Sequence, residues 1–115
     1  MSGKRVVKRV RFHGDAKERL SGFPDDVRED LGHNLFQVQN GRDPADWKPM
    51  NTVGPNVKEI RARNADGTWR VIYLATLPDL VHVFHAFEER TRKTSQHDIN
   101  VARERYQELM RSLKQ

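Results

Sequence analysis

The sequence contains no cysteine, and this absence excludes several kinds of chemistry. Without thiols the chain can form no disulfide framework, no thiolate nucleophile and no cysteine-based zinc site. Long apolar runs are also missing, because none approaches the roughly 18 to 20 residues that span a bilayer. The basic stretch VVKRVRF near the N-terminus is too short and too charged for a signal peptide. We therefore expect a cytoplasmic protein outside the thiol-dependent enzyme classes.

Histidine is present but not in a metal-binding pattern. No HExxH or comparable pair occurs, and His13 and His97 stand alone in the sequence. The sequence therefore predicts no metal site, and no motif in it points to a cofactor.

Basic residues are abundant, and their distribution is uneven. The formal net charge is +5 and the pI is near 9.9, which favours a polyanionic partner. The N-terminal segment from Lys4 to Arg11 is basic, residues 15–30 are rich in Asp and Glu, and the second half is basic again. The N-terminal arginines and lysines fit two interpretations equally well, contact with RNA or protection of an edge strand.

The 115 residues suit a single domain, residues 1–115, with one layer of helices and one sheet. Apolar residues at spacings of three and four predict a helix from Pro24 to about Gln39, after a short helix that Asp15 caps. A C-terminal helix is expected after Thr94 or Ser95, either of which can cap it.

Alternating apolar residues predict strands at residues 5–12, 57–63, 69–76 and 80–87. The first is basic, as edge strands often are, and the last is apolar on both faces, as a central strand is. Strict alternation places Val81, Val83 and His85 together on one face of that strand. The proline-rich segment from residue 41 to 56 is expected to be a long loop. The order indicates an α+β fold, an antiparallel meander with helices mainly on one face.

Three positions are candidates for chemistry. Arg70 lies among apolar residues, so it either pairs with Glu59 or Asp66 or clamps a phosphate with its planar guanidinium. His85 is either a hydrogen-bonded core residue or a proton donor and acceptor. Arg90 and the basic residues after it follow the end of a strand, where a loop fixed before a capped helix is a good platform for a phosphodiester.

Several segments in succession resemble one family: DWKPM, GPNVKEIR, WRVIY, VHVFHAFEERTRKT and DINVARERYQEL. From about Phe23 to Leu109 they are similar to the phage-associated, HigB-like branch of the RelE/ParE toxin superfamily. The resemblance implies a small antiparallel sheet with two N-terminal helices packed on it and a C-terminal helix. It also implies a type II toxin with a helix-turn-helix, HigA-like antitoxin, and cleavage of mRNA on the ribosome. In that reaction the 2′-hydroxyl attacks the adjacent phosphate without a metal.

Matched by position, the resemblance makes Arg70 the phosphate-stabilising arginine and Arg90 the second member of a basic pair. Glu89 occupies the first position of that pair, and Glu59 stands where a second lysine is common. No tyrosine begins the last helix, so His85 becomes the nearest candidate for general acid or base. The residues expected to bind RNA are Lys58, Arg61, Arg63, Arg92 and Lys93.

Two other functions remain open at this point. One is a non-enzymatic toxin that, like ParE-type relatives, binds a protein such as DNA gyrase. The other is a phage-derived protein that has lost toxicity, which the acidic residues Glu59 and Glu89 would permit.

Overall fold

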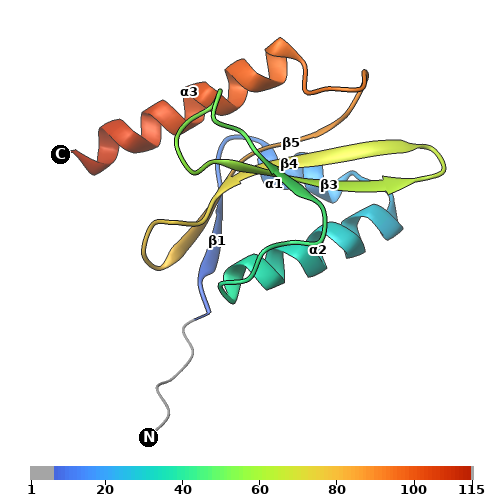
Figure 1. The fold of residues 1–115 in the computed structure, drawn as a ribbon, viewed down its shortest axis with the longest axis horizontal. Helices are drawn as coiled ribbons and strands as arrows, with labels where there is room; N and C mark the ends of the chain where they lie inside the picture. Colours follow the sequence, from blue (N-terminus) through green and yellow to red (C-terminus); the bar gives the residue numbers. More distant parts are fainter. Residues whose placement is uncertain (1–6, 115) are drawn as a thin grey trace, which may run out of the picture.

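The computed structural model describes residues 7–114, in which a five-stranded sheet lies between helices (Figure 1). No helix in this part of the chain is long and apolar enough to cross a membrane. In chain order the elements are β1 (Arg9–Phe12), α1 (Ala16–Ser21), α2 (Asp25–Gln39), β2 (Trp47–Pro49), β3 (Lys58–Asn64), β4 (Gly67–Leu74), β5 (Leu80–Glu88) and α3 (Gln96–Leu113).

The strands are ordered β1-β5-β4-β3-β2 across the sheet. The central meander β3-β4-β5 is antiparallel, as the sequence predicted. β1 lies at an edge, as predicted, but it pairs parallel to β5, so the sheet is mixed. β5 pairs with β1 only after the chain has passed through α1, α2 and the strands between them. No local pattern in the sequence predicts so distant a parallel pairing. The first two residues of the predicted strand at 5–12 lie outside the described residues.

The predicted loop from residue 41 to 56 contains a strand that the sequence reading missed. β2 pairs antiparallel with β3 at the other edge of the sheet, with Trp47 opposite Ile60 and Lys48 opposite Glu59. β2 has only three residues, too few to show the alternation of apolar and polar residues that predicts a strand. Its edge position tolerates Pro49, because the side of Pro49 that lacks an N–H faces no partner strand.

The helix boundaries agree closely with the sequence pattern. α2 ends at Gln39 as predicted, although it begins at Asp25 because Pro24 has an extended ψ of 149° and acts as the N-cap. Ser95 caps α3, with its side chain accepting a hydrogen bond from the Asp98 backbone N–H. Asp15 precedes α1 but makes no side-chain cap bond, because its carboxylate accepts from Arg19 and Arg105 instead.

Helices cover both faces of the sheet, which corrects the expectation that they lie mainly on one (Figure 1). β4 and β5 carry apolar side chains on both faces of the sheet, so helices have to pack on each face. The core under α1 and α2 contains Val27, Leu31, Leu35, Ile60, Val71, Val81 and Val83. The core under α3 contains Val57, Ile72, Leu74, Phe84, Phe87, Ala102 and Leu109.

A bulge in β5 changes which side chains face α3. Ile72 pairs with His85 and Tyr73 with Val83, so Phe84 is an extra residue in the ladder. A one-residue insertion inverts the alternation beyond it. Phe84 packs in the core under α3, as alternation from Val83 already gives. The bulge brings His85 to the same side, where it bonds to Asp98 of α3 instead of sharing a face with Val81 and Val83. The predicted face of His85 was wrong for this reason.

His13 is not isolated in the structure. Parallel pairing of β1 and β5 places its Nε2 2.9 Å from Nδ1 of His82. Burial, reinforced by His82 and the nearby arginines Arg11 and Arg105, lowers the pKa of His13 from 6.5 to about 4. Burial also lowers the pKa of His82. Both rings are therefore uncharged at neutral pH.

The packing predicts different effects for two phenylalanines. Phe84 is fully buried, whereas Phe36 on α2 is 55% exposed. Phe84→Ala should lower the free energy of unfolding by about 3 to 5 kcal/mol, because it leaves a cavity in the core. Phe36→Ala should change it by less than about 0.5 kcal/mol. Urea denaturation of both variants measures the difference, and equal effects would contradict the assigned core.

The histidine pair predicts acid sensitivity. Because the pKa of His13 is lower in the folded protein, the unfolded chain binds more protons between pH 6.5 and about 4. The stability contributed by the neutral ring is complete above pH 6.5 and is lost as the pH falls towards 4. In urea denaturation at a series of pH values, His13→Asn should show a shallower fall across this window than the parent. If stability falls equally steeply with pH in His13→Asn and the parent, His13 does not contribute to the acid sensitivity.

Candidate functional site

Arg70 on β4 lies in a buried cluster of charges on the α3 side of the sheet. Its side chain is 2% exposed and donates to the carboxylates of Glu59 on β3 and Glu89 just after β5. Glu59 is fully buried and Glu89 is 12% exposed. The two carboxylates outweigh the effect of burial and raise the pKa of Arg70 above its ordinary value. One of the two roles that the sequence allowed, pairing with Glu59, is thus confirmed.

Further contacts connect this cluster to the loop between β5 and α3. The Thr94 hydroxyl donates to Oε2 of Glu59 at 2.5 Å, and Nη2 of Arg70 lies 3.4 Å from the carbonyl oxygen of Arg92. Nζ of Lys48 on β2 lies 3.7 Å from Oε1 of Glu59. We call Glu59, Arg70, Glu89 and Thr94 the anchor cluster, because it ties β3 and β4 to that loop.

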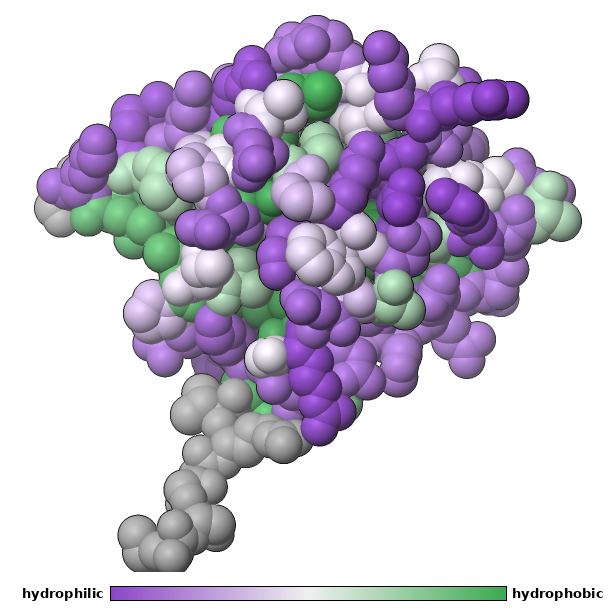
Figure 2. All heavy atoms as spheres, viewed as in Figure 1, coloured by the Kyte–Doolittle hydropathy of each residue, from purple (hydrophilic) through white to green (hydrophobic). Residues whose placement is uncertain are grey.

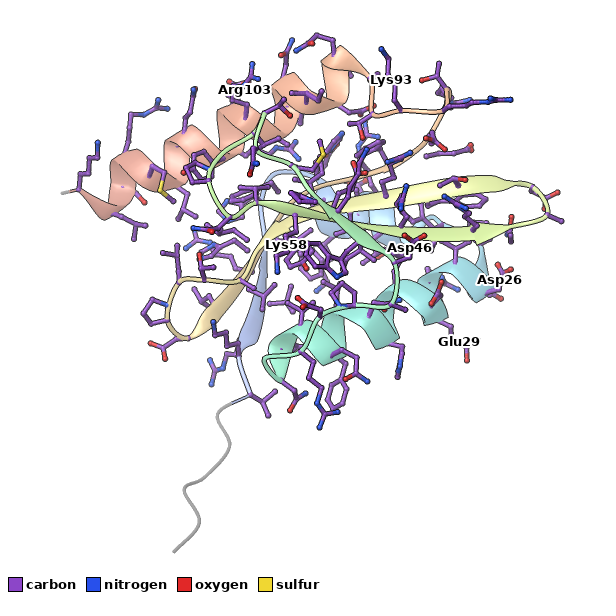
Figure 3. All side chains as sticks on the ribbon, in the orientation of Figure 1. Asp26, Glu29, Asp46, Lys58, Lys93 and Arg103 are labelled. Atoms are coloured by element: carbon purple, nitrogen blue, oxygen red, sulfur yellow. The ribbon has the colours of Figure 1, made fainter. Side chains whose placement is uncertain are left out.

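The loop itself, residues 89–95, presents three exposed cations: Arg90, Arg92 and Lys93. It is fixed at its start, where the Glu89 N–H donates to the Thr68 carbonyl, and at its end, where Ser95 caps α3. Figure 3 shows Lys93 where the chain approaches α3. We call residues 89–95 the basic loop. Its anchors are buried while its cations face outward, so the backbone is held and the charges stay accessible.

Arg90 lines a groove of about 670 Å³, which we call the Arg90 groove. The groove runs from the turn between α1 and α2 to the end of β5 and the start of α3. Other polar side chains around it include Arg19, Glu88, Ser95, His97 and Asp98, and its apolar part includes Phe23, Trp69 and Phe87. Two arginines and a histidine thus line one accessible groove, together with the carboxylates of Glu18, Glu88 and Asp98.

His85 is buried behind this groove. Its Nε2 lies 2.7 Å from Oδ1 of Asp98, whose other oxygen accepts from the Ser95 hydroxyl at 2.6 Å. The ring stacks on Phe87 and is 1% exposed. Burial lowers its pKa despite Asp98, so it is neutral near pH 7. The geometry matches the hydrogen-bonded core histidine, one of the two interpretations that the sequence left open.

The Nδ1 atom of His85 is buried and has no hydrogen-bond partner among the residues that the structure describes. With Nε2 bonded to a carboxylate, the neutral ring carries its proton there and Nδ1 is left as an acceptor. Proton exchange with a ligand would require the start of α3 to move. His85 in this state holds Asp98, and through it the cap of α3.

The remaining predicted RNA-binding residues are divided between the two faces of the sheet. Arg61 is on the α3 side, opposite Arg70, and its Nη2 lies 2.7 Å from Oδ1 of Asp46. Arg63 is exposed two residues further on. Lys58 alternates with them and faces the other side, where its Nζ lies 3.1 Å from Oδ1 of Asp43 and 4.3 Å from the centroid of the Trp47 ring. The structure therefore brings Arg61, Arg63 and Arg70 to one face and separates Lys58 from them.

Two residues near the basic loop were missed by sequence reasoning. His97 lies two residues after the Ser95 cap and lines the Arg90 groove. Lys48 lies on β2, directly opposite Glu59 in register. The position of His97 in the first turn after a cap was a usable signal. Lys48 had none, because β2 itself was not predicted.

The anchor cluster predicts a large loss of stability for one substitution. Arg70→Ala leaves the buried carboxylate of Glu59 and the partly buried one of Glu89 without their cation, and should lower the free energy of unfolding by about 3 to 5 kcal/mol. Arg63→Ala, an exposed arginine on the same face, should cost less than about 0.5 kcal/mol. Adding Glu59→Gln and Glu89→Gln to Arg70→Met should recover much of the loss. Urea denaturation measures all three, and equal stability of Arg70→Ala and Arg63→Ala would contradict the cluster.

Comparisons with known proteins agree with the fold. A double arginine-to-alanine variant of the E. coli toxin RelE, solved in the free state, has a TM-score of 0.59 with 19% identity. The match covers 90% of this chain and 98% of that one, and confirms the predicted RelE-like α+β fold. No curated protein matches the sequence. The family model described as "Phage derived protein Gp49-like (DUF891)" matches residues 18–107. The chain therefore belongs to the Gp49-like family of phage derived proteins.

Proposed function

We propose that this protein is the toxin of a type II toxin-antitoxin system and cleaves mRNA on the ribosome. The observation that carries the proposal is the position of the basic loop, an anchored backbone with outward cations at the end of a RelE-like sheet. The +5 charge of the chain supports a polyanionic substrate. RNA supplies its own nucleophile, the 2′-hydroxyl, so the protein has to orient the strand, stabilise charge and move protons.

The Arg90 groove suits these tasks. Arg90 is exposed and follows directly after the anchored Glu89, so its guanidinium can reach a phosphate without disturbing the core. A guanidinium at that position would stabilise the extra negative charge of the pentacoordinate phosphorane. His97 lines the same groove and is chemically able to accept the 2′-hydroxyl proton or protonate the leaving oxygen. We assign the phosphate contact to Arg90 and a proton transfer to His97.

Arg70 has a different role in this proposal from the catalytic one that the resemblance implies. Its guanidinium is already bonded to Glu59 and Glu89, and it is almost completely buried. We infer that Arg70 positions the basic loop from beneath instead of touching the substrate. Likewise, His85 positions α3 through Asp98. Arg61, Arg63, Arg92 and Lys93 extend the RNA-binding surface on the α3 side, and Lys58 lies outside it.

Partners follow from the same surface. The ribosome and its mRNA would meet the basic loop and the Arg90 groove. A helix-turn-helix, HigA-like antitoxin would neutralise the toxin by covering the exposed cations with acidic residues. The antitoxin would thereby compete with RNA for Arg90, Arg92 and Lys93.

A second candidate is a non-enzymatic toxin that binds a protein target such as DNA gyrase. It is favoured by one observation, the burial of both Arg70 and His85, the two residues first expected to carry chemistry. A chain that has lost toxicity altogether remains a third possibility. The three differ in what expression does to a cell: codon-phased mRNA cuts, growth arrest without cuts, or no arrest.

Mapping the 5′ ends of cellular mRNA after induction without antitoxin tests the proposal. We expect codon-phased ends with the parent protein, and Arg90→Ala should reduce the cleavage rate by about 100-fold because a charge-stabilising donor is lost. Arg111→Ala, an exposed arginine at the far end of α3, is the matched control and should cleave like the parent.

Two results would count against it. Growth arrest without new 5′ ends, together with capture of gyrase, would replace cleavage by protein binding. Cleavage by folded Arg90→Ala at the parental rate would remove Arg90 from the site.

A further inference from the structure

The basic loop also borders a second groove. This groove has a volume of about 380 Å³ and lies between β2 with its following turn, the basic loop and the start of α3. Lys93 and Thr94 line it from the basic loop, and Lys48, Met50, Asn51 and Thr52 are among the residues on the opposite wall. We call it the Lys48–Lys93 groove. The basic loop thus contributes Arg90 to one groove and Lys93 to another.

The walls of the Lys48–Lys93 groove are held in place. Nε and Nη2 of Arg103 on α3 donate to the Thr52 carbonyl at 2.9 and 2.5 Å. The Met50 N–H donates to the Val57 carbonyl at 2.8 Å. Gly54 packs so closely on Tyr106 that an added Cβ would lie 2.5 Å from the ring. The turn after β2 is therefore fixed against α3, and Figure 3 shows Lys93 and Arg103 on this side of the molecule. A ligand would meet a preformed groove.

The charge exposed in this groove is positive. Lys48 and Lys93 come from different walls, and no acidic side chain of residues 7–114 lines the groove. The nearest carboxylate to Lys48, that of Glu59, is fully buried and already bonded to Arg70 and Thr94. The Lys48 side chain is about a third exposed, so its ammonium group can bind a second anion on its outer side.

The remaining lining gives the groove a mixed character. Met50 and Ile99 are buried or half-buried and form apolar surface, while Asn51 and Thr52 are exposed and polar. A nucleotide unit has the same division, an anionic phosphate joined to a sugar and base with apolar faces. No aromatic residue of the described chain lines the groove, so stacking on a base is not offered and binding should depend little on sequence.

We propose that the Lys48–Lys93 groove is a second nucleotide subsite for single-stranded RNA, in which Lys48 and Lys93 hold one backbone phosphate. The inference rests on the proposed function, because the strand bound here would be the same one that enters the Arg90 groove. It adds a residue, Lys48, and a path along both sides of the basic loop. The subsite would fix the position of the strand without taking part in the chemistry.

Binding of an uncleavable strand to the full chain tests this subsite. A fluorescent ten-nucleotide RNA with 2′-O-methyl riboses lacks the attacking hydroxyl, so fluorescence anisotropy reports binding alone. We expect Lys48→Gln and Lys93→Gln each to weaken binding several-fold and to reduce the slope of log affinity against log salt by about 0.7, the value for one lost contact to a single strand. Lys48→Arg should restore both properties.

Lys114→Gln is the matched control, because Lys114 is exposed at the C-terminal end of α3 and lines neither groove. Thermal unfolding of each variant shows that the fold is retained. Parental affinity and salt slope for folded Lys48→Gln would overturn the subsite, and so would an equal loss for Lys114→Gln.

The subsite and the proposed function can fail separately. If Lys48→Gln loses RNA affinity as expected but the parent produces no codon-phased cuts, the subsite stands and cleavage is rejected. If the parent cleaves mRNA and Lys48→Gln binds the strand normally, cleavage stands and the subsite is rejected.

Discussion

The ion pairs of Arg70 with Glu59 and Glu89 hold the start of the basic loop against β3 and β4. A buried guanidinium is tolerated only when it is paired, so the arginine and its two carboxylates depend on each other. Glu59 and Glu89 are also the two acidic residues that stand where the resemblance implies basic ones. Both carboxylates bind the same arginine, and this pairing is the basis for our proposal that Arg70 acts as a structural anchor.

The anchor cluster fixes the backbone of the basic loop and leaves the charged side chains of the loop exposed. The basic loop is held by Glu89 at one end and by Thr94 and Ser95 at the other, while Arg90, Arg92 and Lys93 remain exposed. Hydrophilic side chains cover most of the face in Figure 2, and Figure 3 places Asp26 and Glu29 on α2, on the other side of the sheet from Lys93. An RNA strand would therefore be attracted to the α3 side and repelled from the α2 side.

The sequence was sufficient for the elements whose signals are local. Spacing of apolar residues located α2 and α3, and alternation located the meander. The hydroxyl residues before α3 limited its cap to Thr94 or Ser95, and the structure shows that it is Ser95. The sequence did not predict contacts between residues that lie far apart along the chain. The bulge at Phe84 shifted His85, the contact of His13 with His82 required parallel pairing of β1, and Arg70 found Glu89 19 residues away. None of these contacts leaves a periodic trace in the chain.

The position of Arg70 during RNA binding tests most directly the proposal that Arg70 anchors the basic loop while the cations of that loop contact RNA. Its Nε is buried and unpartnered within the described residues, so the Nε–H should exchange slowly with water and give an observable NMR signal. When the 2′-O-methyl RNA is added, we expect the amide signals of Arg90 to Lys93 to shift while the Arg70 Nε–H signal keeps its position. A shift of the Arg70 signal in step with RNA binding would show that the guanidinium leaves its carboxylates for a phosphate, and would contradict its role as an anchor.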